Sequence, residues 1–394
     1  MAVDLSTFEL LLGQRGNELM AQLGELDPAE SELAIGTRLR RDYPAELVAA
    51  ALTQHRLRIK AVAKFGDQAA SMWFTADALE QATRQPVAAH RANRLVDLGA
   101  TSVVDLGCGI GGDLIAFARV GLTVRGIEAD PVRAAITQAN LAAAGFSGTV
   151  EVGDATLATI DSTEVAFVDP ARRDGRGRTF SLDALVPSWE FVTELLKGRA
   201  VAKVMPGIAH AAVPPGVHPE WVSDSGDLVE ACLWGAGFAL PPNRQATVLP
   251  AGATLLGRHA RVEVGEPLAF LIEPDDAVIR AGLVAELGQD LGGHLLDPHI
   301  AWITSTEPYD GPLGRCFEIV EELPYREKQL KTALRAKDIG TLTVKKRGVQ
   351  IVPEELIKRL GLKGTKSAVV VLTRVNEKGR AFLVTERKQG RSDD

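Results

Sequence analysis

The stretch VVDLGCGIGGD, residues 103–113, decides the fold of this chain. An apolar run closes on Asp105, and Gly107, Gly109 and Gly111 then lead into residues that favour a helix. Glycine adopts backbone angles closed to other residues and lets a ligand approach the main chain. We therefore expect a buried strand, a tight turn that faces a ligand, and a helix start. The spacing is G-x-G-x-G, which differs from the G-x-G-x-x-G fingerprint of dinucleotide sites.

Strand-like and helical segments alternate along the chain after this stretch. Strands are predicted at 102–106, 123–128, 149–152, 165–168 and 200–204, with helices at 113–120 and 131–144. This alternation is typical of a parallel sheet covered by helices on both faces. Two more strands, at 228–233 and 245–249, are joined by GAGFALPPN, which predicts an antiparallel hairpin at the sheet edge.

The sequence as a whole predicts three regions: a helical region at 1–95, an α/β region at 96–255 and an α+β region at 256–394. The first contains predicted helices at 45–66 and 76–99, the second of them interrupted near Pro86. The last contains predicted helices at 275–291 and 327–337, and strands at 340–344, 368–375 and 381–384.

The composition is that of a globular protein, with 46% hydrophobic and 24% charged residues among 394. Three scattered cysteines and seven histidines without ligand spacing predict neither a disulfide framework nor a metal site. The start, MAVDLSTFELLLGQRG, lacks the pattern of a signal peptide, and no apolar run approaches the ~18 residues that span a bilayer. We expect a cytoplasmic protein without membrane contact.

Charge divides the chain unevenly, although the net charge is only −7. Residues 324–394 contain 18 Lys/Arg and 8 Asp/Glu, whereas residues 1–323 contain 26 and 43. An acidic body with a basic end is typical of a protein in which one domain binds a polyanion. A charged surface that only meets solvent is the alternative.

Two acids follow the next predicted strands. Glu128 ends the strand VRGIE, 23 residues beyond Asp105, and Asp154 precedes Ala155 where the following strand ends. The carboxyl ends of adjacent parallel strands line one crevice, where an acid can accept hydrogen bonds from ribose hydroxyls and another can meet an adenine amino group. Each acid alone could instead cap a strand end or a turn.

Together, DLGCGIGG, the acid of GIEAD, the GDA step and the later VDPAR resemble class I S-adenosylmethionine-dependent methyltransferases over about residues 65–250. The resemblance implies a Rossmann-like seven-stranded sheet with an antiparallel last strand. It places Asp105, Gly107 and Gly109 at the methionine part of the cofactor, Glu128 at the ribose and Asp154 at the adenine. Gly111 and Ala155 complete the predicted cofactor-binding set.

Within that superfamily the chain is most similar to trimethylguanosine synthases and related RNA guanine-N2 methyltransferases. The similarity rests on Lys64-Phe65, on Met72-Trp73-Phe74-Thr75 and on the run CGIGGDLIAFARVGLTVRGIEADPVRAAITQAN. It implies that Trp73 and Phe74 form part of the substrate or cofactor pocket. The alternative is that both are core aromatics.

The fourth strand leads into Asp169-Pro170-Ala171-Arg172-Arg173. Amino-group methyltransferases have Asp/Asn/Ser-Pro-Pro-aromatic here, and the polar side chain and a carbonyl accept hydrogen bonds from the target amine. Asp169 and Pro170 match, whereas Ala171 and Arg172 depart from the pattern. We predict Asp169, Pro170 and Arg172 as catalytic residues and Arg173 as a substrate contact, since a guanidinium can stack on a base or bind phosphate. A structural Asp-Pro turn is the alternative.

Asp-Pro-x-Arg also resembles the carbon-5 uracil methyltransferases of RNA. Their chemistry needs a cysteine that adds to the pyrimidine ring, placed after the fifth strand. Residues 200–208, AVAKVMPGI, contain no cysteine, which disfavours that reaction.

The C-terminal region resembles the THUMP-like domain of bacterial methyltransferases, through IEPDDAVIRAGLV (272–284), LDPHIAWITS (296–305) and LKTALRAKDIGTLTVKKRGV (330–349). A true THUMP domain binds RNA. We predict that Lys345, Lys346 and Arg347 contact phosphates, which gives affinity without sequence reading.

The sequence therefore predicts a methyltransferase that uses S-adenosylmethionine, needs no metal and methylates a base in transfer or ribosomal RNA, with a guanine nitrogen favoured. Two alternatives stay open: a small-molecule or protein methyltransferase, and an RNA-binding protein that keeps the cofactor fold without catalysis. The oligomeric state is not predicted.

Overall fold

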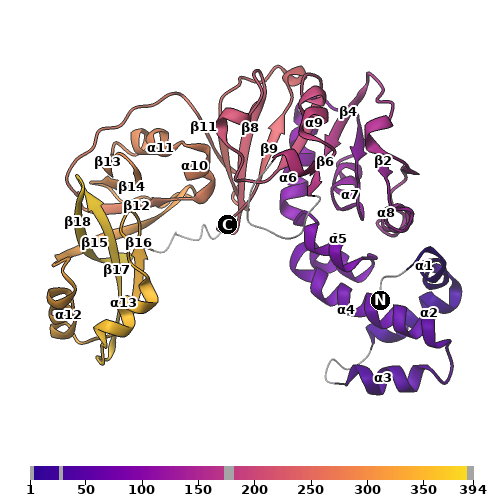
Figure 1. Cartoon of the computed structure of the whole chain (residues 1–394), viewed down its shortest axis with the longest axis horizontal. Coiled ribbons are helices and arrows are strands. Elements are labelled where there is room, and N and C mark those ends of the chain that lie inside the picture. Colours follow the sequence, from indigo (N-terminus) through magenta and orange to yellow (C-terminus); the bar gives the residue numbers. More distant parts are fainter. Residues whose placement is uncertain (1–3, 26–29, 173–181, 388–394) are drawn as a thin grey trace. The chain divides into compact units, whose positions relative to one another are not determined.

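The computed structural model describes residues 4–25, 30–172 and 182–387 (Figure 1). The chain forms two compact units. The first comprises Met1–Val204, Ile208–Val217 and Cys232–Leu240, and the second Met205–Gly207, His218–Ala231 and Pro241–Asp394.

In the described residues 4–25 and 30–101, six α-helices precede the first strand, as the composition of this region predicts. They are α1 (Leu5–Leu12), α2 (Gln14–Gly24), α3 (Glu32–Leu39), α4 (Ala45–Phe65), α5 (Ala76–Gln81) and α6 (Gln85–Asp97), with a 3-10 turn η1 (Gly66–Ala70) after α4. The buried residues of α4 recur at helical spacing, among them Leu47, Ala51 and Ala61. The predicted helix at 76–99 is divided before Pro86, which occupies the first turn of α6.

The alternating segments form the predicted parallel sheet. Its first strands are β1 (Ser102–Leu106), β2 (Thr123–Glu128), β3 (Thr149–Val152), β4 (Glu164–Val168) and β7 (Ala200–Val204), joined through α7 (Gly112–Arg119), α8 (Pro131–Ala143) and α9 (Trp189–Leu195). β1 lies between β2 and β4, with Asp105 opposite Gly126 and Phe167. This arrangement confirms the Rossmann-like fold. Short elements complete this part: η2 (Ala155–Leu157), β5 (Ala171–Arg172), η3 (Leu182–Ala184), β6 (Leu185–Val186), η4 (His210–Ala212) and η5 (Ala236–Phe238).

The sheet has nine strands where seven were expected, in the order β11-β10-β8-β9-β7-β4-β1-β2-β3. The strand predicted at 245–249 is β10 (Gln245–Leu249), and the strands that were not predicted are β8 (His218–Asp224) and β11 (Ala253–Leu256). The predicted hairpin of 228–233 with 245–249 is wrong, because β8 (His218–Asp224) lies between β9 (Asp227–Trp234) and β10 and pairs with β10 in parallel.

The sequence of β8, HPEWVSD, explains why this strand was not predicted. All seven of its residues are buried, although four are polar or charged. Glu220 Oε1 accepts hydrogen bonds from Thr247 Oγ1 at 2.5 Å and from Gln245 Nε2 at 3.1 Å. The buried acid Glu220, which would indicate a loop in the sequence, is therefore satisfied by the neighbouring strand β10.

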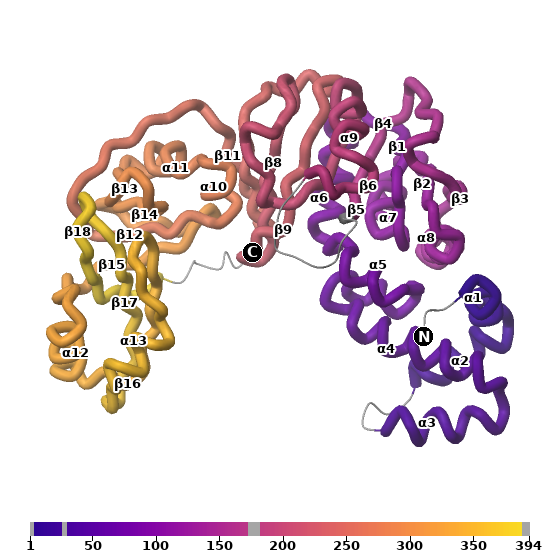
Figure 2. The backbone as a smooth tube through the Cα atoms, in the orientation of Figure 1, coloured from indigo at the N-terminus to yellow at the C-terminus, as the bar shows by residue number. Residues whose placement is uncertain are grey.

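The C-terminal region has the predicted α+β character. Its seven-stranded sheet has the order β13-β14-β12-β15-β18-β17-β16. The strands are β12 (Phe270–Pro274), β13 (His294–Asp297), β14 (Ile300–Ser305), β15 (Gly314–Leu323), β16 (Ile339–Lys346), β17 (Lys366–Val375) and β18 (Lys378–Glu386). Two helices, α12 (Glu327–Ala336) and α13 (Pro353–Leu360), contact β16 (Figure 2).

The helix predicted at 275–291 is two helices, α10 (Asp276–Ala281) and α11 (Val284–Asp290). Gly282 between them has a φ of 71°, a left-handed conformation that ends α10. Across the described ranges of the chain, none of the helices has the length and apolar character that crossing a membrane requires.

Candidate functional site

The turn between β1 and α7 has an open side. Gly107 and Gly109 have φ values of +98° and +59°, and a Cβ atom built on either would have no other atom within 4 Å. At Gly111, with φ +82°, a Cβ would lie 2.9 Å from Thr137 Cγ2 of α8. Gly107 and Gly109 therefore leave room for a ligand, whereas Gly111 is required for close packing of the turn against α8.

Glu128 lies against this turn, as the strand order predicts. Its side chain is buried, and Oε2 accepts the N–H of Gly109 at 2.9 Å. Oε1 accepts the N–H of Asp130 at 3.0 Å and forms an ion pair with Arg133 at 3.0 Å. Three bonds hold the carboxylate at the edge of the turn, so its orientation is fixed in the chain itself.

Asp105 is the buried acid at the end of β1, only 2% exposed. Its Oδ1 atom is buried and has no hydrogen-bond partner within the ranges that the structure describes. Burial raises the pKa of Asp105 well above its ordinary value, and the carboxylates of Asp113, Asp169 and Glu128 raise it further. A buried carboxyl oxygen without a donor, next to an open turn, suits a ligand that carries an ammonium group.

Asp154 lies at the end of β3 and is exposed. Its Oδ1 atom accepts Thr156 Oγ1 at 2.7 Å and Thr156 N–H at 2.8 Å, so it caps the turn η2, and the two bonds lower the pKa of Asp154. Ala155, half-buried, is the first residue of that turn. Glu128 and Asp154 follow paired strands, because the N–H of Gly153 donates to the Glu128 carbonyl at 3.0 Å.

Asp169 lies one residue beyond β4, beside the glycine turn, because Val168 pairs with Leu106. Its Oδ2 atom accepts a hydrogen bond from Lys203 Nζ at 2.5 Å. Lys203 was not predicted as a site residue. Its signal in the sequence is a single lysine in the otherwise apolar strand AVAKV.

Further residues missed by the sequence analysis lie behind this pair. Thr83 accepts from Lys203 and donates to Asp113, and Arg91 pairs with Asp113. No motif marks Thr83 and Arg91, which lie 30 and 22 residues before Asp113 in the sequence.

The residues after Asp169 are described only in part. Pro170 is buried, and Ala171 and Arg172 form the short strand β5, opposite Val186 and Leu185 of β6. The structure describes the backbone of Arg172 but not its side chain, and Arg173 lies outside the described residues. The predicted roles of both arginines stay predictions.

Trp73 and Phe74 do not line an accessible pocket, contrary to the expectation from the resemblance. They are 5% and 0% exposed. The ring of Trp73 packs edge-on against Phe8 with centroids 5.6 Å apart, and Phe74 packs against Phe65 at 5.7 Å. Rings enclosed in this way cannot stack on a base, so the alternative, core aromatics, describes them.

The backbone of this buried segment is held by an amide from α8. Asn140 Oδ1 accepts the Trp73 N–H at 2.7 Å, and Asn140 Nδ2 donates to the Trp73 carbonyl at 3.0 Å and to the Ile110 carbonyl at 2.9 Å. Ile110 belongs to the glycine turn, so one buried side chain joins the segment before the sheet to that turn.

The predicted phosphate-binding set Lys345, Lys346 and Arg347 is divided by strand geometry. Lys345 Nζ lies 2.7 Å from Glu273 Oε2, and Arg347 lies 3.4 Å from Glu273 Oε1 and 3.7 Å from Asp276. Lys346 is exposed, whereas the other two are half-buried. Successive residues of a strand point to opposite faces, so the three cations do not form one surface patch.

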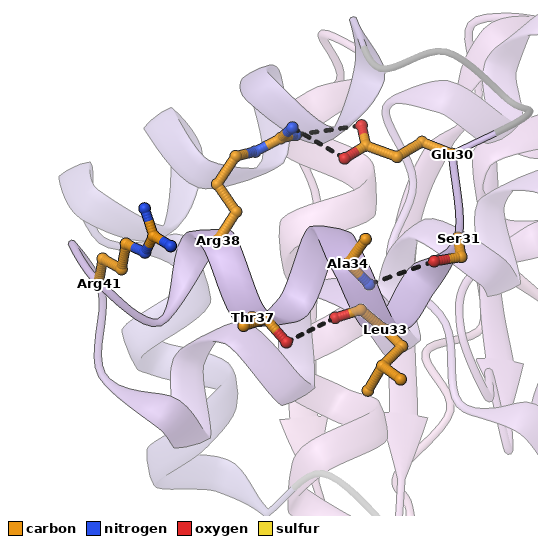
Figure 3. A pocket seen from close by; sticks show the side chains of 7 residues that line it. All are labelled: Glu30, Ser31, Leu33, Ala34, Thr37, Arg38 and Arg41. Carbon is orange, nitrogen blue, oxygen red and sulfur yellow. Dashed lines mark hydrogen bonds and ion pairs between the residues drawn. The ribbon is translucent and has the colours of Figure 1, made fainter.

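A hollow on α3 contains none of the predicted site residues (Figure 3). It is lined by Glu30, Ser31, Leu33, Ala34, Thr37, Arg38 and Arg41. Glu30 pairs with Arg38 at 2.8 Å, and Ser31 caps the helix by accepting the Ala34 N–H. Among the residues described, no group of three or more His, Cys, Asp or Glu could hold a metal ion.

Comparison with known proteins identifies the family. Family models match residues 314–387 (THUMP domain-like), residues 100–168 (RNA cap guanine-N2 methyltransferase) and residues 4–61 (a domain of unknown function, DUF8688). Two Mycobacterium tuberculosis proteins, from strains CDC 1551 / Oshkosh and ATCC 25618 / H37Rv, bear the name uncharacterized S-adenosylmethionine-dependent methyltransferase. Each is 37% identical over 331 residues, which covers 81% of this chain and 90% of the relative.

A solved structure of a protein assigned as a methyltransferase, from Porphyromonas gingivalis W83, has the same fold. Its TM-score is 0.78 at 22% identity, and the match covers 95% of this chain and 99% of that one. The identity to the mycobacterial relatives, over most of both chains, shows that this chain belongs to the S-adenosylmethionine-dependent methyltransferases.

Proposed function

We propose that this methyltransferase transfers the methyl group of S-adenosylmethionine to a nitrogen atom of an RNA base, with guanine as the favoured base. The observation that carries the proposal is the position of Asp169. It follows β4 directly, beside the glycine turn after β1, with a carboxylate that is 36% exposed. An acceptor at this point can hold an amine in line with a methyl group bound at the turn.

The chain's own residues fit the cofactor. Asp105 Oδ1, buried without a donor in the described structure, would accept the ammonium of the methionine part. Gly107 and Gly109 leave open space for that part. Glu128 would accept the ribose hydroxyls, and Asp154, with Ala155 beside it, would meet the adenine.

When bound, the cofactor supplies a methyl group already activated by the sulfonium. Asp169 and the Pro170 carbonyl accept hydrogen bonds from the N–H groups of the target, which turns the nitrogen lone pair toward the methyl. Asp169 then takes the proton that the nitrogen loses and passes it to water. Orientation of this kind contributes several kcal/mol to a transfer between two bound groups.

RNA as the substrate is supported by three observations. The region around the glycine turn matches the guanine-N2 methyltransferase model, and the C-terminal sheet matches the THUMP-like model. Residues 324–394 also contain 18 Lys/Arg against 8 Asp/Glu, although the whole chain has a net charge of −7. Such charge attracts phosphates without reading bases.

The test is methyl transfer from isotopically labelled S-adenosylmethionine to total RNA from a strain that lacks this gene. We expect label in RNA from that strain and little in RNA from the parent strain, where the sites are already filled. Nuclease digestion and chromatography then identify the base. Label found in the protein or small-molecule fraction of the same lysate, and none in RNA, would contradict the proposal.

A further inference from the structure

Lys203 is an unusual residue for its position in the sheet. It lies in β7, whose other four residues are at most 6% exposed. Its own side chain is only 15% exposed. An ammonium group in such surroundings is costly unless hydrogen bonds replace the lost water. Asp169 and Thr83 supply two of these bonds.

The bonds continue beyond Lys203 to the start of α7. Lys203 Nζ donates to Thr83 Oγ1 at 3.1 Å, and Thr83 Oγ1 donates to Asp113 Oδ2 at 2.7 Å. Asp113 lies in the first turn of α7, directly after the glycine turn, and its other oxygen is bound by Arg91. Thr83 is 7% exposed and Arg91 1%, so the connection runs through the protein interior.

The consequence concerns the two oxygens of Asp169. Lys203 occupies Oδ2, while Oδ1 has no hydrogen-bond partner within the described residues. A carboxylate fixed through one oxygen presents the other in a defined direction. Since the far end of the connection is the helix that follows the glycine turn, that direction is set relative to the cofactor site.

We propose that Lys203 is a positioning residue of the methyltransferase: through Oδ2 it holds Asp169 so that Oδ1 faces the target nitrogen, and through Thr83 and Asp113 it fixes this acceptor relative to the glycine turn. The inference rests on the proposed function, in which Asp169 binds the amine. In this proposal Lys203 acts through Asp169 and not by contact with the target or the cofactor.

The test compares three variants in the labelled-methyl assay with RNA from the deletion strain. Lys203→Met keeps the length of the side chain and removes the charge. Lys203→Arg keeps a donor that can reach a carboxylate. Lys197→Met removes a lysine that pairs with Glu194 on the surface, both about 70% exposed, and is the matched control.

For Lys203→Met we expect kcat to fall about 10- to 100-fold, the scale of a misplaced reacting group. KM for RNA and the dissociation constant for S-adenosylhomocysteine should stay within about 3-fold of wild type, which a general loss of structure would not allow. Lys203→Arg should recover most of kcat. Adding Lys203→Met to Asp169→Ala should cost nothing more, because both act through one bond. An unchanged kcat in Lys203→Met would overturn the proposal.

A crystal structure of Lys203→Met decides the same point without a substrate. We expect the Asp169 carboxylate to rotate away from its wild-type position while the glycine turn is unchanged. If wild-type enzyme labels no RNA, the proposed substrate is wrong, yet this comparison still tests Lys203. An Asp169 side chain in the wild-type orientation would show that Lys203 does not position it.

Discussion

Gly109 and Glu128 are joined by a hydrogen bond of 2.9 Å from the backbone N–H to Oε2, so the glycine turn and the acid at the end of β2 form one unit before any ligand binds. Glu128→Ala removes both the ribose acceptor and a support of the turn. We expect S-adenosylhomocysteine to bind about 10- to 100-fold more weakly, the loss of one or two charged hydrogen bonds. Isothermal titration calorimetry measures the dissociation constant of S-adenosylhomocysteine for wild type and variant.

The control for this variant is Glu151→Ala. Glu151 lies on β3, is 57% exposed and pairs with Arg125 at 3.6 Å. Its removal should leave cofactor affinity within about 2-fold of wild type, as for most surface substitutions. Equal affinities for the two variants would show that Glu128 does not bind the cofactor.

Asp105 predicts a pH dependence of stability. Because burial raises the pKa of Asp105, the folded chain holds a proton that the unfolded chain releases near pH 4. Stability is therefore lost as the pH rises from about 4 toward the folded-state pKa, and the cost is absent below pH 4. Asp105→Asn removes this cost. Its stability relative to wild type, measured by urea unfolding without cofactor, should increase with pH in that window.

The same carboxyl predicts proton release on cofactor binding. An ammonium beside Asp105 favours the ionised form of its carboxyl group. At a pH at which Asp105 is protonated in the unliganded protein, binding of S-adenosylhomocysteine should therefore release a proton from Asp105. 5′-Methylthioadenosine, which lacks the amino-acid part, should release none. Calorimetry in buffers of different ionisation enthalpy distinguishes the two ligands. Identical proton release would place the amino-acid part away from Asp105.

Asp169→Ala tests the proposed acceptor. We expect turnover to fall at least ~100-fold, the usual scale for a positioned acid–base or hydrogen-bonding group. Cofactor affinity should change little, because Asp169 meets the target and not the cofactor. An enzyme with wild-type turnover would reduce Asp169 to a structural residue of the turn after β4.

Asn140 predicts a stability effect. Asn140→Asp keeps the acceptor for the Trp73 N–H but turns a carboxylate toward the carbonyls of Trp73 and Ile110. We expect a loss of about 2–4 kcal/mol in the free energy of unfolding, since two buried carbonyls lose their donor. Gln138→Ala, an exposed position on the same helix, should cost less than about 0.5 kcal/mol. If Asn140→Asp also costs less than about 0.5 kcal/mol, Asn140 does not hold the Trp73 segment against the glycine turn.

The C-terminal cations predict different effects of single substitutions on RNA binding. Lys346→Ala should lower the slope of log affinity against log salt by about 0.7, one phosphate contact to a single strand. Lys345→Ala should instead lower stability by about 1 kcal/mol, because Glu273 loses a partner in a half-buried pair. RNA binding at several salt concentrations and urea unfolding separate the two. Equal salt slopes in wild type and Lys346→Ala would exclude Lys346 as a contact.

The sequence by itself determined the central architecture. Strands β1, β2, β3 and β7 have the predicted bounds, because short apolar runs separated by amphipathic helices have few other ways to bury their side chains. The glycine turn and Glu128 were also predictable. Their conformations depend on local residue type and on the rule that adjacent parallel strands end at one edge.

Only the tertiary structure decided the polar connections. The strand HPEWVSD was missed because its acid Glu220 is satisfied by Thr247 and Gln245 of β10, which follow more than 20 residues later. Lys203, Thr83 and Asp113 meet although 120 residues separate the first two, and no local pattern encodes such a meeting. The packing of distant segments likewise buries Trp73 and places Glu273 beside Lys345. Periodicity reports which face of an element is apolar, whereas the partner of a polar group is fixed only when distant segments pack together.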